Sequence, residues 1–327
     1  MANTQVFDRY LLLERVATGS MAEVFRARQL GAGPLAADVA VKRLLPGLAG
    51  DGWVAQQYLR EVDALRRIDH PAVVKLLHAG RGNDLPYIAM PWLGGVNLRQ
   101  LLAGVADPAD RAAATGQGST ARRLDVAMAL GIAGQVAQGL AAAHAAGVVH
   151  RDLSPTNVQI SQEGLVVLID FGIAQVTGLA SLDSAEHMPG KWAYASPEQR
   201  NGQPLDRRTD LFALGLLLRE MLTGQSPDGQ TDAHRQYAEL EPAQLQELLN
   251  TLLATDPRQR AADATEVAAT LAKLLATLGK PDLTAELRQL VLQRPAPPPA
   301  HEWSAAELRG ETVTQPHLDP DATLVHM

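Results

Sequence analysis

The sequence contains no cysteine, so it can form neither a disulfide bond nor a metal site built from thiolates. Its first ten residues are mixed and polar, without the basic start and apolar run of a secretory signal peptide. A continuous run of roughly 18 apolar residues is also missing, because the best run, residues 211–218, is much shorter. From these absences we expect neither an export signal nor a membrane span.

Excess positive charge is missing as well. The chain carries 29 Lys and Arg residues against 36 Asp and Glu residues, a formal net charge of -7, whereas a surface that binds nucleic acid is basic. We therefore expect no nucleic-acid partner, and a cysteine-free chain without an export signal is expected in the cytoplasm. Aromatic residues make up only 4% of the 327 residues, while Ala and Leu dominate and favour helix.

Hydrophobic periodicity divides the chain into a part rich in strands and a part rich in helices. Apolar residues at helical spacing predict a helix over residues 56–68, with Leu59 on its apolar face. A later Ala-rich helix is predicted to end before Gly147, a residue typical of the position after a helix C-terminus. The other predicted elements are strands over residues 39–42, 87–90 and 166–169, and helices over residues 124–146, 210–222 and 262–278.

Composition shifts predict how these elements are grouped. Residues 106–122 are rich in Ala, Gly and Ser and are predicted to be a surface loop. Five consecutive residues, 295–299, contain four prolines, which neither a helix interior nor a central strand accepts. We expect a small β-rich lobe over residues 7–93, a larger helical lobe over 94–279, an additional helix within 280–294 and a disordered Pro-rich tail over 295–327.

Two short motifs carry most of the chemical information. The first is His150-Arg151-Asp152-Leu153-Ser154-Pro155-Thr156-Asn157, and the second is Asp170-Phe171-Gly172. Taken alone, the first motif is compatible with an ordinary turn between strands that is capped by Asp and Asn side chains. Together, in this order and at this spacing, they supply a carboxylate that can orient a hydroxyl and oxygen ligands of the kind that Mg²⁺ prefers.

On these motifs the chain resembles the eukaryotic-type protein kinase superfamily, and bacterial serine/threonine protein kinases in particular. The resemblance extends over residues 7–278. It implies an α+β fold with two lobes and transfer of the γ-phosphate of ATP to protein Ser and Thr hydroxyls. It also implies ATP and Mg²⁺ as cofactors and a protein substrate that the sequence does not identify.

The resemblance assigns roles to five residues. Asp152 would accept or orient the substrate hydroxyl, and Asn157 and Asp170 would hold magnesium. Lys42, at the end of a predicted strand, would bind the α- and β-phosphates. Glu61, on the predicted helix, would form an ion pair with Lys42; a solvent-exposed lysine and glutamate are the simpler alternative for these two positions.

The nucleotide pocket is expected at the junction of the lobes. The phosphate-covering loop keeps only the middle family glycine, Gly19, because Ala17 and Ala22 replace the outer two, and alanine resists positive φ. We therefore expect a stiffer loop and a lower affinity for ATP. The remaining predicted contacts of ATP are Val16, Val24 and Ala40 above the base, Met90, Pro91 and Leu93 along the hinge, and Gln159 below the base.

Three further positions depart from the family pattern. Gln159 replaces an aliphatic residue, so it needs a hydrogen-bond partner for its amide. Ser154 replaces a lysine, which removes a positive charge near the transferring phosphate. Lys191 stands where serine/threonine kinases carry a threonine.

The activation segment is expected to span residues 170–198. The resemblance predicts a buried ion pair between Glu198 and Arg260 and hydrogen bonds from the catalytic loop to Asp210. Thr177, Ser181 and Ser184 in the segment, and Thr312, Thr314 and Thr323 in the tail, are candidate phosphorylation sites.

Two other functions remain open at this point. A pseudokinase would use the same fold as a binding or scaffold module, and the changes at the glycine loop, Ser154 and Gln159 favour it. A kinase for small molecules could share the two lobes, but the Ser196-Pro197-Glu198 ending belongs to a segment that docks polypeptides.

Overall fold

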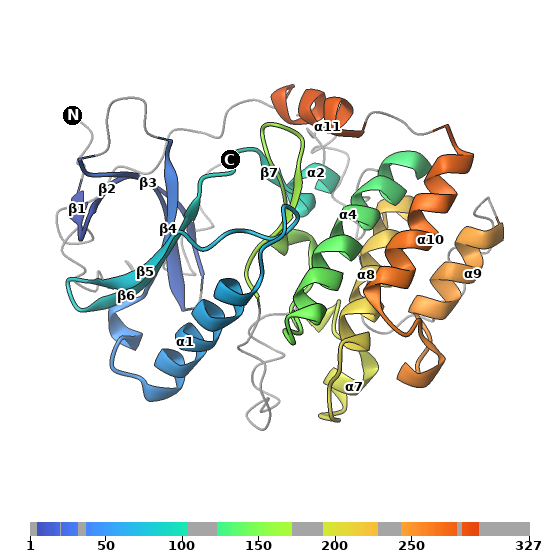
Figure 1. Ribbon diagram of the computed structural model, residues 1–327, viewed down its shortest axis with the longest axis horizontal. Coiled ribbons are helices and arrows are strands. Elements are labelled where there is room, and N and C mark those ends of the chain that lie inside the picture. The colour runs from blue at the N-terminus through green and yellow to red at the C-terminus, as the bar shows by residue number, and fades with distance from the viewer. Residues whose placement is uncertain are drawn as a thin grey trace, which may run out of the picture.

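The computed structural model describes residues 5–19, 21–31, 37–103, 123–171, 192–227, 243–279 and 283–293. Several predictions lie outside these ranges: the loop over residues 106–122, the tail over 295–327, and the residues Gly172, Thr177, Ser181, Ser184, Lys191, Thr312, Thr314 and Thr323. The described residues form a β-sheet lobe with one long helix and a mainly helical lobe beside it (Figure 1), as expected for the α+β class.

The small lobe is built on one antiparallel sheet with the strand order β1-β2-β3-β4-β6-β5. The predicted strands over residues 39–42 and 87–90 are confirmed as parts of β4 and β6. Aromatic side chains on one face form the core of the lobe, where Phe7, Phe25 and Tyr87 are buried. The strands are β1 (Gln5–Phe7), β2 (Tyr10–Thr18), β3 (Ala22–Gln29), β4 (Val39–Leu44), β5 (His78–Gly82) and β6 (Leu85–Pro91).

Helix α1 (Gly52–Arg67) follows a 3-10 turn at Pro46–Leu48 and begins four residues earlier than the periodicity predicted. The Asp51 side chain accepts hydrogen bonds from the Trp53 and Val54 amides, so the helix starts at a cap rather than at its first apolar repeat. The prediction that Leu59 lies on the apolar face was wrong, because its side chain is exposed. Tyr58 faces the sheet instead and donates hydrogen bonds to the backbone of β5 and β6.

The large lobe is organised around helices α4 and α8, which are buried along most of their lengths. A small sheet in the order β7-β8-β9 lies where this lobe meets the other. The helices are α2 (Leu98–Ala103), α4 (Val126–Ala145), α7 (Pro197–Arg200), α8 (Arg208–Thr223), α9 (Ala243–Leu252), α10 (Ala264–Thr277) and α11 (Leu283–Leu292). The strands are β7 (Val96–Asn97), β8 (Val158–Ile160) and β9 (Val166–Leu168), and 3-10 turns lie at Pro155–Asn157 and Pro257–Gln259.

Helix α4 leaves the expectation of no membrane span unconfirmed. Within the described residues it is one helix that is long and apolar enough to do so, although Gln and His side chains interrupt every continuous apolar run. In this fold 61% of its most apolar window is buried inside the lobe, as in the core helix of a globular domain. Asp125 caps its start, and Gly147, at a φ of 74°, follows its end as predicted.

Helix α11 lies within the range predicted for an additional helix and packs against the large lobe. Its Leu283 and Leu287 side chains are buried in the same apolar cluster as helices α4 and α8. Close approach explains two glycines: a Cβ at Gly131 would lie 2.4 Å from Leu283, and one at Gly164 would lie 2.1 Å from a backbone oxygen of α11. The β8–β9 turn is thereby held against the end of the described chain.

Candidate active site

The site is centred on the Lys42 side chain, which joins the two lobes. Its Nζ atom lies 2.7 Å from Glu61 Oε1 on helix α1 and 2.6 Å from Asp170 Oδ1, just after strand β9. Lys42 is placed by strand β4, and Glu61 lies on the side of α1 that faces the sheet. The predicted Lys42–Glu61 ion pair is therefore present, and Asp170 shares the same ammonium group.

Two carboxylates and one ammonium group crowd this cluster. Burial disfavours the charge on Lys42, but the neighbouring Asp170 and Glu61 carboxylates outweigh it and hold the pKa of Lys42 above its ordinary value. Burial raises the pKa of Glu61, and repulsion from Asp170 adds to the rise against the lowering effect of Lys42. The cluster thus carries more negative than positive charge, and a further cation would relieve the repulsion.

The catalytic-loop motif lies directly beside this cluster. Asn157 Nδ2 donates to the Asp152 backbone oxygen at 2.7 Å and to Asp152 Oδ2 at 3.1 Å, which fixes the Asp152 carboxylate. The Asn157 backbone oxygen accepts from the Ile169 amide, so Asn157 and Asp170 are held in adjacent positions. Because the Asn157 amide nitrogen is engaged by Asp152, the oxygen is the end of that side chain suited to a metal ion.

Asp210 anchors the catalytic loop from below, as predicted. Its carboxylate accepts from the backbone amides of His150 and Arg151, each at 2.8 Å. Sequence reasoning missed the third partner, His144 on helix α4, whose Nε2 atom lies 2.8 Å from Asp210 Oδ2. The missed histidine could have been noticed as a polar residue at the end of an otherwise apolar helix.

Backbone strain gathers at the same place. Arg151 has a φ of 63° and Asp170 a φ of 53°, in the left-handed region that non-glycine residues rarely occupy. The His150 and Phe171 rings, both buried, pack with centroids 4.7 Å apart and support these two turns. Both strained residues therefore belong to segments that the surrounding packing fixes in one conformation.

Strand register places four of the predicted nucleotide contacts on one face of the small lobe. Val24 pairs directly with Lys42, and Ala40 pairs with Met90, so these four side chains share a face. Val16, in contrast, has an exposed side chain and lies at a register shift of strand β2. This face of the sheet is the roof under which we expect the base.

The hinge is held by its own backbone on both sides. Pro91 ends strand β6, and the Trp92 amide donates to the Asp38 backbone oxygen. The Leu93 backbone oxygen accepts from the Gln162 amide at 3.2 Å, which ties the hinge to the β8–β9 turn. The segment that would present hydrogen bonds to a base is therefore fixed to both lobes.

Two of the departures from the family pattern have structural partners. Gln159 Nε2 donates to the Gly94 backbone oxygen at 2.5 Å, so the polar group below the base satisfies the expected need for a partner. Ser154 is buried, and its Oγ atom lies 2.9 Å from Thr156 Oγ1. This serine stabilises the loop locally and supplies no charge in place of the lysine.

The phosphate-covering hairpin, residues 17–24, accommodates both of its alanines in strand conformation. Ala17 and Ala22 lie in extended strands, and neither residue has a positive φ. The Gly19 amide donates to the Ala22 backbone oxygen at 2.8 Å and closes the described part of the turn. In this conformation the alanines therefore carry no backbone strain.

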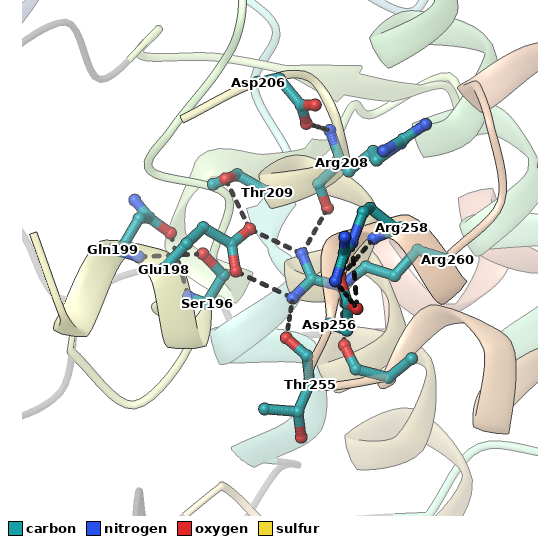
Figure 2. Close-up of polar contacts among 11 residues, drawn as sticks. Ser196, Glu198, Gln199, Asp206, Arg208, Thr209, Thr255, Asp256, Arg258 and Arg260 are labelled. Carbon is teal, nitrogen blue, oxygen red and sulfur yellow. Dashed lines mark hydrogen bonds and ion pairs between the residues drawn. The ribbon is translucent and has the colours of Figure 1, made fainter. Parts of the chain in front are cut away.

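A buried ion pair supports the end of the activation segment, as Figure 2 shows. Arg260 donates from NH1 to Glu198 Oε1 at 2.6 Å and from NH2 to Glu198 Oε2 at 2.8 Å, the predicted pairing in bidentate form. The same guanidinium group donates to the backbone oxygens of Arg208 and Thr255, and the Thr209 hydroxyl donates to Glu198. The pair is therefore fully enclosed by hydrogen-bonding partners.

A second buried carboxylate, Glu220, was not found from the sequence. It accepts from Arg99 NH1 at 2.6 Å, from the Ser226 hydroxyl at 2.7 Å and from the Tyr194 hydroxyl. These partners come from α2, from the loop after α8 and from the end of the activation segment. No local pattern could have connected them, because they are brought together only by folding.

The donor set at the junction fits a magnesium ion that also binds substrate. Among the residues that the structure describes, no three His, Cys, Asp or Glu side chains form a ready-made metal site. Mg²⁺ commonly takes one or two protein oxygens and completes its shell with phosphate oxygens and water. Asp170 and the Asn157 oxygen, beside a cluster with excess negative charge, would supply that partial shell.

Comparisons with known proteins agree with this geometry. Residues 10–282 match the family described as Protein kinase domain. Serine/threonine-protein kinase PknL of Mycobacterium tuberculosis is 30% identical over 322 residues, which cover 94% of this chain and 74% of PknL. Probable serine/threonine-protein kinase CPE1738 of Clostridium perfringens is 33% identical over 220 residues, 67% of this chain but only 29% of that protein.

A solved structure shows the same fold. The PknI kinase domain of Mycobacterium tuberculosis superposes with a TM-score of 0.62 at 26% sequence identity, covering 84% of this chain and 99% of that one. The family match extends over both lobes and includes every residue of the Lys42 cluster. The chain belongs to the protein kinase domain family.

Proposed function

We propose that this chain is an ATP-dependent serine/threonine protein kinase that also phosphorylates itself. The observation that carries the proposal is the convergence of Lys42, Glu61, Asp170 and the Asp152–Asn157 pair at the junction of the lobes. Complete retention of these groups disfavours a pseudokinase. ATP is most abundant in the cytoplasm, so we place the catalytic domain in the cytoplasm.

The residues divide the work of phosphoryl transfer. Lys42 would bind and neutralise phosphate oxygens, while Glu61 holds the ammonium group in position. Asp152, fixed by Asn157, would accept a hydrogen bond from the substrate hydroxyl and align its oxygen with the γ-phosphate. Mg²⁺, when held by Asn157 and Asp170, would neutralise the phosphate charge that develops during transfer.

The nucleotide would lie against the face formed by Val24, Ala40 and Met90. The Pro91 backbone oxygen and the Leu93 amide would bind the base edge, with Val16 above it and Gln159 below it. Gly19 would let the backbone of the hairpin approach the phosphates. The same proposal divides the chain into a small lobe over residues 7–93, a large lobe over 94–279, an additional helix within 280–294 and a tail over 295–327.

Transfer of radiolabel from γ-labelled ATP tests the proposal, with Asp152→Asn as the matched control. We expect label on the chain itself and on a generic protein substrate, and a loss of roughly 100- to 10,000-fold in the Asp152→Asn variant. Phosphoamino-acid analysis should give phosphoserine and phosphothreonine. Equal labelling of both proteins would refute the role of Asp152, and phosphotyrosine alone would refute the substrate class.

A further inference from the structure

One of the two alanines that replace family glycines, Ala22, packs into an apolar contact between the sheet and helix α1. Ala22 lies on strand β3 directly opposite Leu44 of strand β4. Its methyl group is buried in an apolar cluster with Leu44 and with Val54 of helix α1. A glycine at position 22 would have no side chain to contribute to this contact.

The neighbouring residue fixes the hairpin from the opposite face of the sheet. Glu23 pairs across the strands with Arg43, the residue after Lys42, and its Oε2 atom accepts from Arg43 NH2 at 2.8 Å. Arg15 on strand β2 donates to the other carboxylate oxygen at 2.8 Å. One buried carboxylate therefore connects the three strands that surround the phosphate-covering turn.

Arg43 is an unusual residue for the interior of this lobe. Its side chain is buried, and its guanidinium carbon lies 4.8 Å from the Phe25 ring centroid and 5.3 Å from that of Phe7. Two aromatic faces and the Glu23 carboxylate stabilise the cation there. Because breaking a buried ion pair leaves an uncompensated charge, this contact resists separation of β3 from β4.

We propose that Ala22 and the Arg15–Glu23–Arg43 cluster are positioning residues that hold the phosphate-covering hairpin in a preformed position above Lys42. On one face of the sheet, the Ala22 contact joins the hairpin to the Lys42 strand and to the Glu61 helix. On the other face, Glu23 joins strands β2, β3 and β4. A preformed hairpin orders fewer residues when a nucleotide binds, and this preorganisation favours affinity. The inference rests on the proposed function, because it concerns the ATP site.

The inference predicts that restoring the family glycine weakens nucleotide binding. In Ala22→Gly, the lost methyl contact and the added backbone freedom should raise the Kd of Mg-ATP by roughly threefold to tenfold. Ala22→Ser keeps a Cβ and should bind like the wild type. Ala27→Gly removes a buried methyl from the same strand, away from α1, and should also bind like the wild type while losing stability.

Amide hydrogen exchange without nucleotide tests the anchoring separately. Ala22→Gly and Arg43→Met should both speed exchange across residues 16–24 relative to the wild type, whereas Ala27→Gly should leave that segment slow. Two results would overturn the inference and leave the proposed function intact. One is that Ala22→Gly binds Mg-ATP as tightly as the wild type or more tightly. The other is that Ala27→Gly loses as much affinity for Mg-ATP as Ala22→Gly does. A wild-type chain that fails to bind Mg-ATP would instead remove the proposed function and this inference with it.

Discussion

The Lys42 cluster and the Glu198–Arg260 pair are made of similar ionic groups but lie in different surroundings. At the junction of the lobes, the Lys42 ammonium group forms ion pairs with two carboxylates, and the Asp170 side chain is 39% exposed. In the helical lobe, one guanidinium group serves one carboxylate, and the two side chains are 0% and 3% exposed. The first cluster has unbalanced charge and access to solvent, whereas the second is balanced and closed.

This difference indicates what each cluster does. A balanced, enclosed pair has no capacity for another ligand, so its role is to hold the end of the activation segment, at Glu198, against the large lobe. An unbalanced, accessible cluster with raised carboxyl pKa can accept a cation or a phosphate. Mutations should therefore affect stability at one site and chemistry at the other.

The largest expected effect on stability follows from breaking the closed pair. Arg260→Met leaves Glu198 buried without its partner and should lower the free energy of unfolding by about 3–5 kcal/mol. Urea denaturation measures this loss. The double variant Glu198→Leu/Arg260→Met removes both charges and should recover most of the stability; a loss below about 1 kcal/mol in the single variant would contradict the closed-pair interpretation.

The open cluster should respond in the opposite way. Lys42→Met should reduce phosphoryl transfer at least about 100-fold, because a charge that stabilises the phosphates is lost. The free energy of unfolding should fall by less than about 2 kcal/mol, because Glu61 can take up a proton and Asp170 remains partly solvated. Transfer assays and urea denaturation on the same preparation measure the transfer rate and the free energy of unfolding. If Lys42→Met lost as much stability as Arg260→Met, the two clusters would not differ as proposed.

Asp210 binds the catalytic loop while its neighbour Thr209 binds Glu198, so a change at Asp210 should give an intermediate effect. In Asp210→Asn an amide group would face backbone N–H donors, so one of the hydrogen bonds from His150 or Arg151 is lost. We expect a loss of about 1.5–3 kcal/mol in stability together with slower transfer, because the strained catalytic loop relaxes. Hydrogen exchange should become faster at residues 150–152; unchanged exchange there would refute the anchoring role.

The smallest effect concerns pH. Burial opposes the charge on Glu198, but the hydrogen bonds and positive charge of Arg260, together with a backbone hydrogen bond and one from Thr209, outweigh it and hold the pKa of Glu198 below its ordinary value of 4.5. The folded state therefore binds this proton less readily than the unfolded state, so the pair contributes fully above about pH 4.5 and loses its contribution as the pH falls further. The free energy of unfolding of Glu198→Gln should depend less steeply on pH in that range than that of the wild type. Parallel pH curves for the two proteins would contradict a lowered pKa of Glu198.

Much of the site could be predicted because the responsible residues lie in short contiguous motifs. Lys42 ends a predicted strand, and Asp152, Asn157 and Asp170 fall within 19 residues whose order and spacing imply one arrangement. The Glu198–Arg260 pair followed from the resemblance to protein kinases, supported by the requirement that a buried charge be matched. Fold class followed from the change between strand and helix periodicity along the chain.

The remainder depends on contacts that no local pattern contains. Helix α1 begins at the Asp51 cap, before its apolar repeat, and Tyr58 rather than Leu59 reaches the sheet. Glu220 meets Arg99 across 121 positions of sequence. The burial of Arg43 between aromatic rings could not be predicted either, because an arginine at a strand end is usually solvent-exposed.

The most direct test of the open cluster is unfolding of the wild-type chain with and without Mg-ATP. If the Lys42 cluster is a nucleotide site, Mg-ATP at about 100 times its Kd should raise the free energy of unfolding by about 2.7 kcal/mol, and Lys42→Met should lose most of this gain. An unfolding curve that Mg-ATP leaves unchanged in the wild-type chain would contradict the account.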